Sequence, residues 1–504
     1  MKTIYKILSI TIVLVISQAC SEEFLDIKPE GPVESDFWQT ADQADQGLLA
    51  AYNPLQTEAT YGRAEWFFTT TSDDYWVGRN KASIREWELF NMYTDIDYYY
   101  SHWQDFWSII KRSGDVLRNV PDMDITDAEK NRLTGEAHFL TGFAYFNLIT
   151  KYGGMPIYDY LNAPSDFYIS RSSTEETYAY IEKQLLEAVN KLQHYSIAPK
   201  GRATKGSALG MLSKVLIYQE KYEEVIEYSD VLFESGYYEL YKPNSDPDTF
   251  EEGYENYIGV FQPDANNCSE QLFAVQGKAW TGTTGGPITS IVFMPQNANN
   301  GWNYFHPVPA LTNSFSADDP RKKATVFIKG EDDDFPYKDY GGAGNDIYLY
   351  TPDETNDTDM NFKKFAHAYS VEGYINWEGN NNISILRLSD VYLLRAEAEI
   401  ELNGDGAGDI WINLVRERVG LEPISNASLV QLKEERRWEL AGELQRYYDI
   451  IRWDDAKDIF HNTTIDEDPR GARTTFDPIK HSVFPIPINA INASKETLEQ
   501  NPMY

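Results

Sequence analysis

Apolar residues recur at helical spacing through much of the chain. The stretch TGEAHFLTGFAYFNLITKYGG, residues 134–154, ends in two glycines, and Pro156 follows it. A glycine pair and a proline after a periodic segment predict the end of a helix. The apolar residues that fall on one face of this predicted helix are Ala137, Leu140, Ala144 and Leu148. The next segment, STEETYAYIEKQLLEAVNKL, opens with Ser173 and Glu176 at the spacing of a capping box, which predicts another helix start.

Two later stretches have the pattern of an antiparallel helix pair. Residues 206–236 hold two apolar-periodic segments joined by a short polar turn at Gln219–Lys221. This arrangement of small and large residues is typical of a tetratricopeptide repeat, a helix pair of about 34 residues. Residues 386–420 repeat the pattern, with NGDGAGD, residues 403–409, as the turn. A third long helix is predicted from about Leu429 to Ile451.

The segment between these helix pairs, about 241–382, has a different character. It is rich in Gly, Asn, Asp, Pro and aromatic residues, and few helical periods occur in it. The stretches EQLFAVQ and DIYLY predict short strands. Because long loops in compact domains are usually functional, we interpret this segment as a loop-rich excursion that carries a binding function.

The N-terminus has the features of an export signal. Lys2 and Lys6 precede the apolar run ILSITIVLVI, and Ala19 precedes Cys20. The run is too short to span a bilayer, which takes about 20 apolar residues, so residues 1–19 are interpreted as a signal peptide. A small residue before a cysteine favours a lipoprotein signal with Cys20 acylated, although Ser17 stands where leucine is usual. The alternative is a plain secretory signal with an incidental cysteine.

Charge and cysteine content narrow the possible functions. The formal net charge is −35, which disfavours binding to nucleic acid or to anionic lipid surfaces. The only other cysteine is Cys268, so acylation of Cys20 would leave no disulfide partner for it. Cys268 is interpreted as a small buried residue near the start of a strand.

The chain lacks the common sequence motifs for catalysis and metal binding. The chain has no phosphate-binding loop, no H-E-x-x-H, no G-x-S-x-G and no C-x-x-C. The NGDGAGD turn lacks the glutamate that completes a calcium loop. Two acidic stretches in the excursion, GEDDDF and PDETNDTDMN, leave calcium possible there, with a solvated acidic loop as the alternative. No cofactor is otherwise expected.

Tryptophan and tyrosine residues in polar stretches are the candidate binding residues. Trp66 and Trp76 lie in EWFFTTTSDDYWVGRN, Trp280 in GKAWTGTTGG, and Trp302 with Tyr304 in NNGWNYFHPVP. Aromatic rings stack on the apolar faces of sugars, and nearby polar groups bond the hydroxyls. The predicted ligand-binding residues are therefore Trp76, Trp302, Trp280, Asp73, Arg79, Tyr304 and Trp66. Local packing of these rings within loops is the alternative, and it is strongest for Trp66.

Several long motifs resemble the SusD/RagB family of outer-membrane nutrient-binding lipoproteins from Bacteroidota. They are ILRLSDVYLLRAEAEI (385–400), INLVRERVGL (412–421), EERRWELAGELQRYYDIIRW (434–453) and the closing VFPIPINAINASKETLEQNPMY. Further upstream, GEAHFLTGFAYFNLITKYGGMP, GWNYFHPVPALTNSF and DDPR fit the same pattern in order. The sequence CSEEFLD also resembles a surface-export signal, in which Glu22 and Glu23 follow the acylated cysteine.

The resemblance implies a fold, a partner and a location. The fold would be mainly α-helical, a tetratricopeptide-like scaffold at about 36–240 and 383–456, with the partly β excursion at 241–382 and a C-terminal segment at 457–504. The mature protein, 20–504, would be lipid-anchored on the cell surface at the outer membrane. It would capture oligosaccharide for a SusC-like TonB-dependent transporter without being an enzyme. The matched arginines, Arg387, Arg395, Arg436, Arg437 and Arg446, are expected to form structural ion pairs.

Three alternatives stay open at this point. The same architecture binds peptides in some members of the family that the chain resembles. A glycoside hydrolase would need two carboxylates facing each other across a cleft at about 5–9.5 Å. A purely structural repeat protein would lack an exposed aromatic cluster.

Overall fold

The computed structural model describes most of the 504-residue chain. The described residues are 37–78, 81–94, 98–161, 168–277, 292–293, 302–330, 356–365 and 381–504, with the backbone of four short strands between residues 335 and 375. None of the helices in these ranges has both the length and the apolar character needed to cross a bilayer.

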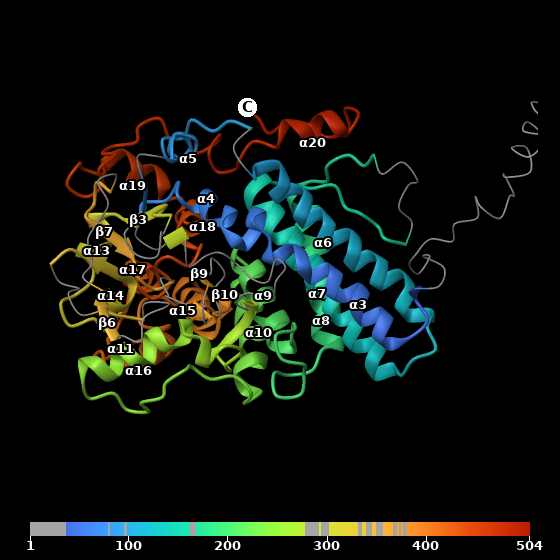
Figure 1. The fold of residues 1–504 in the computed structure, drawn as a ribbon, viewed down its shortest axis with the longest axis horizontal. Coiled ribbons are helices and arrows are strands. Elements are labelled where there is room, and N and C mark those ends of the chain that lie inside the picture. Colours follow the sequence, from blue (N-terminus) through green and yellow to red (C-terminus); the bar gives the residue numbers. More distant parts are fainter. Residues whose placement is uncertain are drawn as a thin grey trace, which may run out of the picture.

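The first half of the chain is helical. Its α-helices are α3 (Ala41–Tyr52), α4 (Ala64–Thr69), α5 (Ala82–Glu88), α6 (Tyr99–Asn119), α7 (Asp127–Tyr152), α8 (Thr174–Lys191), α9 (Lys205–Ile217) and α10 (Tyr222–Glu234). Each helix from α6 to α10 packs against the next one along the chain. Figure 1 shows α6, α7 and α8 side by side, with β3, β6 and β7 at the opposite end of the molecule.

Helix boundaries follow the predicted signals. The side chain of Ser173 accepts the backbone N–H of Glu176 at the start of α8, and the Glu176 side chain accepts the N–H of Ser173. Helix α7 ends at Gly153, whose φ of +76° is readily reached only by glycine. Close packing of α7 on α8 depends on Gly142, since a Cβ there would lie 2.9 Å from Cγ of Leu185.

The scaffold resumes after the excursion. Helix α15 (Leu388–Asn403) packs against α9 and α10, and it also contacts α16 (Asp409–Arg418) and α17 (Leu429–Glu439). The turn between α15 and α16 contains Gly404 and Gly406 with positive φ, so NGDGAGD is a helix–helix turn as predicted. The mainly helical, repeat-like architecture is therefore confirmed.

The single long helix predicted from Leu429 to Ile451 is wrong. The segment forms α17 and then α18 (Arg446–Arg452), and the chain turns between them. Gly442 has a φ of +83° and Leu444 a φ of +69°, which no α-helix accommodates. Helices α19 (Ala456–Asn462) and α20 (Ile488–Ala493) complete the chain.

The excursion consists of short helices and two-stranded antiparallel pairs. Its described elements are α11 (Phe250–Ile258), β2 (Gln271–Val275), β3 (Phe305–Pro307), α13 (Pro309–Ser314), α14 (Pro320–Thr325), β4 (Val326–Ile328), β5 (Phe335–Lys338), β6 (Asn345–Tyr348), β7 (Met360–Phe362), β8 (Ser370–Val371), β9 (Tyr374–Ile375) and β10 (Ile383–Arg387). The strand predicted at EQLFAVQ is β2, and the one at DIYLY overlaps β6.

One strand pair joins the N-terminal region to the excursion. Strand β1 (Tyr75–Val77) pairs with β3, so Trp76 lies opposite His306 in the register. The other pairs are β2 with β10, β4 with β7, β5 with β6, and β8 with β9. The β1–β3 pair brings Tyr75–Val77 next to Phe305–Pro307.

A buried ionic network connects excursion and scaffold. The carboxylate of Glu439 on α17 accepts hydrogen bonds from Arg418 at 2.6 and 2.7 Å, from Arg387 at 2.9 Å and from Arg321 at 3.3 Å. A buried charge is tolerable only when it is paired and hydrogen-bonded in this way. The expectation that the matched arginines form structural ion pairs is confirmed for Arg387, Arg395, Arg436, Arg437 and Arg446.

Candidate functional site

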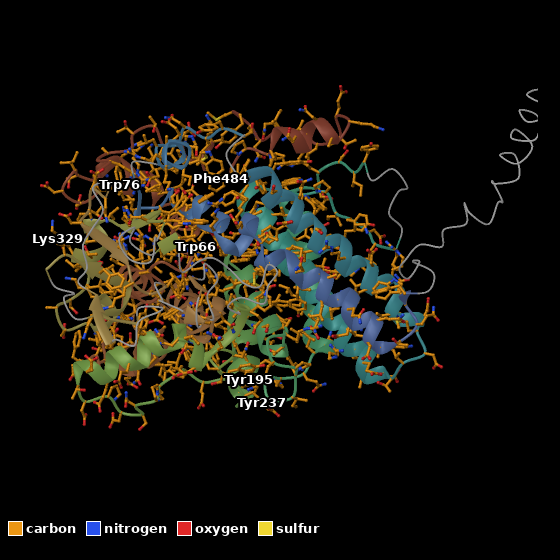
Figure 2. The ribbon with its side chains drawn as sticks, viewed as in Figure 1. Trp66, Trp76, Tyr195, Tyr237, Lys329 and Phe484 are labelled. Atoms are coloured by element: carbon orange, nitrogen blue, oxygen red, sulfur yellow. The ribbon has the colours of Figure 1, made fainter. Side chains whose placement is uncertain are left out.

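Two of the predicted binding tryptophans are packing residues. The Trp66 side chain is 1% exposed and that of Trp76 is 3% exposed. The indole N–H of Trp66 donates to the Gly442 carbonyl oxygen at 3.3 Å, and the Trp76 ring lies under the Arg85 guanidinium at 4.7 Å. Figure 2 labels both side chains within the ribbon. Their assignment as ligand platforms is therefore wrong, because elements distant in sequence cover them.

Asp73 is also a structural residue. Its carboxylate accepts two hydrogen bonds from Arg446, from Nε at 2.8 Å and from an Nη at 2.7 Å. Although burial opposes ionisation, the charges of Arg446 and Arg437 hold the pKa of Asp73 well below its usual range. With both oxygens engaged by Arg446, Asp73 does not face a ligand, which corrects its prediction as a sugar-binding group.

Several predicted residues lie outside the described residues. These are Cys20, Arg79, Trp280 and, in the two acidic stretches, residues 331–334 and 352–355, so the predictions for them stay predictions. Within the described ranges, no three or more His, Cys, Asp or Glu side chains gather in a way that could hold a metal ion. Calcium in the acidic stretches likewise stays a prediction.

Trp302 and Tyr304 take part in a half-buried aromatic and cationic cluster. We call it the Arg63 cluster, and its members are Arg63, Lys81, Tyr98, Trp302 and Tyr304. The guanidinium carbon of Arg63 lies 4.2 Å from the ring centre of Tyr98, 5.2 Å from that of Trp302 and 5.8 Å from that of Tyr304. The two rings of the excursion, Trp302 and Tyr304, have centres 6.0 Å apart. The cluster therefore joins four separate segments of the chain.

Polar contacts fix the orientation of these rings. An Nη of Arg63 donates to the Tyr304 hydroxyl at 3.0 Å, and the other pairs with Glu58 at 3.0 Å. Lys81 places its ammonium 4.1 Å from the Tyr304 ring centre. Partial burial, together with the nearby charge of Arg63, lowers the pKa of Lys81. Cations over ring faces at these distances attract the π-systems, so the rings are held in place before any ligand arrives.

Helix starts meet at the Arg63 cluster. Arg63, Lys81 and Tyr98 are the residues immediately before α4, α5 and α6, and no side-chain hydrogen bond caps any of these three starts. First-turn N–H groups have no partner within their own helix. Tyr98 has a φ of +65°, a conformation that turns the chain sharply into α6.

The backbone beneath the rings is anchored by the strand pair. The N–H of Gly78 donates to the Tyr304 carbonyl at 3.2 Å, and the N–H of Tyr304 donates to the Val292 carbonyl at 3.0 Å. The Tyr304 ring also stacks on Phe67 of α4 at 6.2 Å. A rigid base of this kind holds one face of each ring toward the core.

Arg63, Lys81 and Tyr98 were missed by the sequence reasoning. Neither arginine nor lysine stands out in its local stretch, and the positive φ of Tyr98 cannot be read from residue types. The one available signal was the tyrosine-rich run YTDIDYYYSHW, which is unusual immediately before a helix. Their ligand roles, like those of Trp302 and Tyr304, are proposals developed below.

The helical scaffold with its inserted excursion has the fold of solved SusD-like proteins. The family model described as "SusD family" matches residues 269–504, and a second, "Starch-binding associating with outer membrane", matches residues 23–217. The chain belongs to the SusD family.

Relatives and solved structures agree with this assignment. A SusD-like protein of Bacteroides ovatus is 27% identical over 89% of this chain and 82% of its own length. The starch-binding protein SusD of Bacteroides thetaiotaomicron is 24% identical over 75% of this chain and 74% of its own. A solved laminarin-binding SusD-like protein is 26% identical with a TM-score of 0.72, covering 92% of this chain and 100% of that one. A surface glycan-binding protein A of Bacteroides thetaiotaomicron, solved with laminarihexaose, shares the fold at a TM-score of 0.74, with 23% identity over 91% and 99% of the two chains.

Proposed function

We propose that this protein binds neutral oligosaccharides at the cell surface and that the Arg63 cluster is its binding site. The observation that carries the proposal is the set of half-buried rings of Tyr98, Trp302 and Tyr304 around one guanidinium group. Sugar rings present C–H faces that stack on such aromatics, and each aromatic contact contributes on the order of 1 kcal/mol.

Polar groups at the same place suit sugar hydroxyls. Arg63 and Lys81 supply charged donors, and Glu58, whose side chain is 41% exposed, supplies an acceptor. A site with both donors and acceptors fits hydroxyl groups better than it fits a purely apolar ligand.

The ligand class we propose is a neutral glucan. The net charge of −35 disfavours strongly anionic polymers through long-range repulsion. The SusD-type relatives whose names state a ligand are described as binding laminarin, laminarihexaose or starch, which are all uncharged glucose polymers. Laminarihexaose and maltohexaose are therefore suitable probes for the β- and α-linked forms.

We further propose that the protein acts without catalysis and delivers its ligand to a SusC-like TonB-dependent transporter. Membership of the SusD family supports delivery, since one of the matching family models is described as associating with the outer membrane. The carboxylate of Glu58, which lies beside the Arg63 cluster, is paired with Arg63. Glycoside hydrolysis takes two carboxylates with free and opposed roles.

Calorimetric titration tests the proposal. Purified protein lacking residues 1–20 is titrated with laminarihexaose, with maltohexaose and, for the peptide alternative, with an uncharged hexapeptide. The proposal predicts saturable binding of at least one hexasaccharide, no binding of the peptide, and recovery of the sugar intact after overnight incubation. Binding of the peptide alone, or release of shorter sugars, would contradict it.

A further inference from the structure

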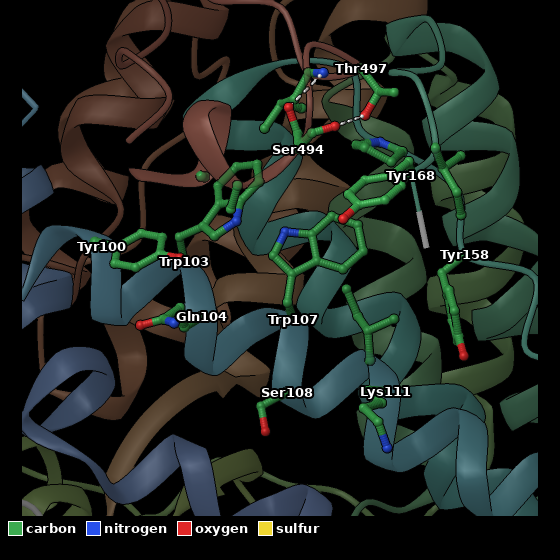
Figure 3. A pocket seen from close by; sticks show the side chains of 16 residues that line it. Tyr100, Trp103, Gln104, Trp107, Ser108, Lys111, Tyr158, Tyr168, Ser494 and Thr497 are labelled. Carbon is green, nitrogen blue, oxygen red and sulfur yellow. Dashed lines mark hydrogen bonds between the residues drawn. The ribbon is translucent and has the colours of Figure 1, made fainter. Parts of the chain in front are cut away.

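A second aromatic pocket lies on the other side of the start of α6. It has a volume of about 590 Å³, and Figure 3 shows the side chains that line it. Its walls come from α6, from residues 156–158 and 168–169, and from α20 with the residues after it. Five aromatic residues line it: Tyr100, Trp103, Trp107, Tyr158 and Tyr168. Volumes of this size are typical of pockets that hold small ligands.

Two neighbouring indoles form the floor of this pocket. Trp103 and Trp107 are one helical turn apart on α6, with ring centres 5.9 Å apart and planes at 50°. Trp103 packs edge-on against Tyr152 at 5.1 Å, and Trp107 packs against Tyr145 at 5.8 Å. One edge of each indole is thus held by α7, while the rings line the opening.

One donor in the pocket has no acceptor. The indole Nε1 of Trp107 is buried and has no hydrogen-bond partner among the residues that the structure describes. Figure 3 shows this nitrogen on the side of the ring that faces Trp103. A buried N–H without an acceptor costs about 1–3 kcal/mol, so a ligand oxygen at this point would remove a penalty.

The charge of the lining favours an uncharged ligand. No Asp or Glu is among the lining residues that the structure describes, in a chain whose net charge is −35. Among the described lining residues the single cation is Lys111, which is paired with Asp115 at 2.9 Å, and the ammonium of Lys495 lies 4.2 Å from the ring centre of Tyr168. The polar groups that remain, including Gln104 and Ser108, are neutral donors and acceptors of the kind that bond hydroxyls.

The pocket is continuous in sequence with the Arg63 cluster. Tyr98 belongs to that cluster, and Tyr100, two residues later, lines the pocket. The start of α6 therefore carries one ring into each site. We propose that this pocket is a second carbohydrate-binding site, specific for neutral oligosaccharides, next to the first. The inference about ligand class rests on the proposed function, whereas the location does not.

The test is the number of binding sites per chain for laminarihexaose and maltohexaose, measured by calorimetry. Ser108→Trp fills the pocket from a half-buried position without removing core volume. The matched control is Ser425→Trp, which lies in an exposed loop that lines none of the described pockets. We expect two sites in the parent and in the control, and one site after Ser108→Trp. Trp107→Phe keeps a stacking ring but loses the N–H, and it should weaken the second site about threefold to tenfold.

The outcomes separate this inference from the proposed function. A single site that is lost with Trp302→Ala but unaffected by Ser108→Trp would overturn the second pocket and leave the first intact. A single site lost with Ser108→Trp but unaffected by Trp302→Ala would support the pocket and overturn the Arg63 cluster. Loss of co-purification with a transporter after Ser108→Trp, with unchanged sugar binding, would identify the pocket as a protein interface and overturn the inference.

Discussion

Asp73 and Arg446 form a two-pronged ion pair, with Nε and Nη of the arginine 2.8 and 2.7 Å from the two carboxylate oxygens. The pair fastens residues just before β1 to α18, across more than 370 positions of sequence. Asp73 is 6% exposed, and removal of its carboxylate takes two charge-assisted hydrogen bonds from Arg446, whose side chain is 14% exposed.

Asp73→Ala is therefore expected to destabilise the fold rather than the sugar complex. Breaking a buried pair by removing one partner costs about 3–5 kcal/mol in the free energy of unfolding. Urea denaturation measures this change, and Asp458→Ala, at an exposed position on α19, is the control that should stay within about 0.5 kcal/mol. Unchanged stability with weakened sugar binding would restore Asp73 as a ligand residue.

Glu88 makes stability depend on pH. Its carboxylate accepts the N–H of Val77 at 2.7 Å and lies 3.4 Å from Arg470. Burial raises the pKa of Glu88 to about 8 from an ordinary 4.5. The folded protein thus holds this proton more tightly than the unfolded chain does, so the contribution of Glu88 to stability falls as pH rises from 4.5 to about 8.

Glu88→Gln should remove this pH dependence. We expect the melting temperature to fall less between about pH 6 and about pH 8 in the variant than in the parent. Glu86→Gln changes an exposed carboxylate on the same helix and should leave the parent's profile unchanged. Parallel profiles for the parent and Glu88→Gln would show that Glu88 is ionised throughout this range.

If Cys20 carries the lipid anchor, its replacement should release the protein from the membrane, whereas replacement of Cys268 should not. Cys20→Ala should appear in the soluble fraction after cell disruption, because no acyl chain is then attached. Cys268→Ala, which removes the half-buried thiol that forms no disulfide, should stay with the membranes. If Cys20→Ala stays in the membrane fraction and resists salt, either the lipid proposal is wrong or the transporter alone retains the protein.

Partnership with a transporter predicts a stable complex. Tagged protein purified from native membranes in mild detergent should bring down a TonB-dependent barrel in about equal amount. The same experiment on Cys20→Ala shows whether the complex needs the anchor. Recovery of the protein alone in several detergents would contradict the proposed delivery.

The helical scaffold was predictable because its signals are local. Ser173 caps α8, and Gly153 ends α7, through contacts within a few residues of each position. The break after Glu439 was not predicted, because the apolar pattern continues through Gly442, whereas the positive φ values of Gly442 and Leu444 interrupt the helix.

The candidate site was predictable only in part, since it depends on contacts between distant segments. Trp66 and Trp302 both lie in polar stretches. The Trp66 indole is buried and donates to the carbonyl oxygen of Gly442, whereas Trp302 remains half-exposed. Local composition does not show which segment, several hundred residues away in the sequence, packs against a given ring. Arg63 lies more than 230 residues from Tyr304, so no local pattern could connect them.

The central claim is that Trp302 binds sugar, whereas Trp76 packs in the core. It is tested most directly by calorimetric titration of Trp302→Ala and of Trp76→Ala with laminarihexaose and with maltohexaose. A melting curve is measured for each variant. Loss of the Trp302 platform should raise Kd about tenfold or more, since about 1.4 kcal/mol is a factor of ten, with little change in melting temperature. Loss of the buried Trp76 should reduce the free energy of unfolding by about 3–5 kcal/mol and so lower the melting temperature strongly. The Kd of the folded protein should stay unchanged. An unchanged Kd in Trp302→Ala, or a tenfold weaker Kd in a Trp76→Ala protein of normal stability, would contradict the account.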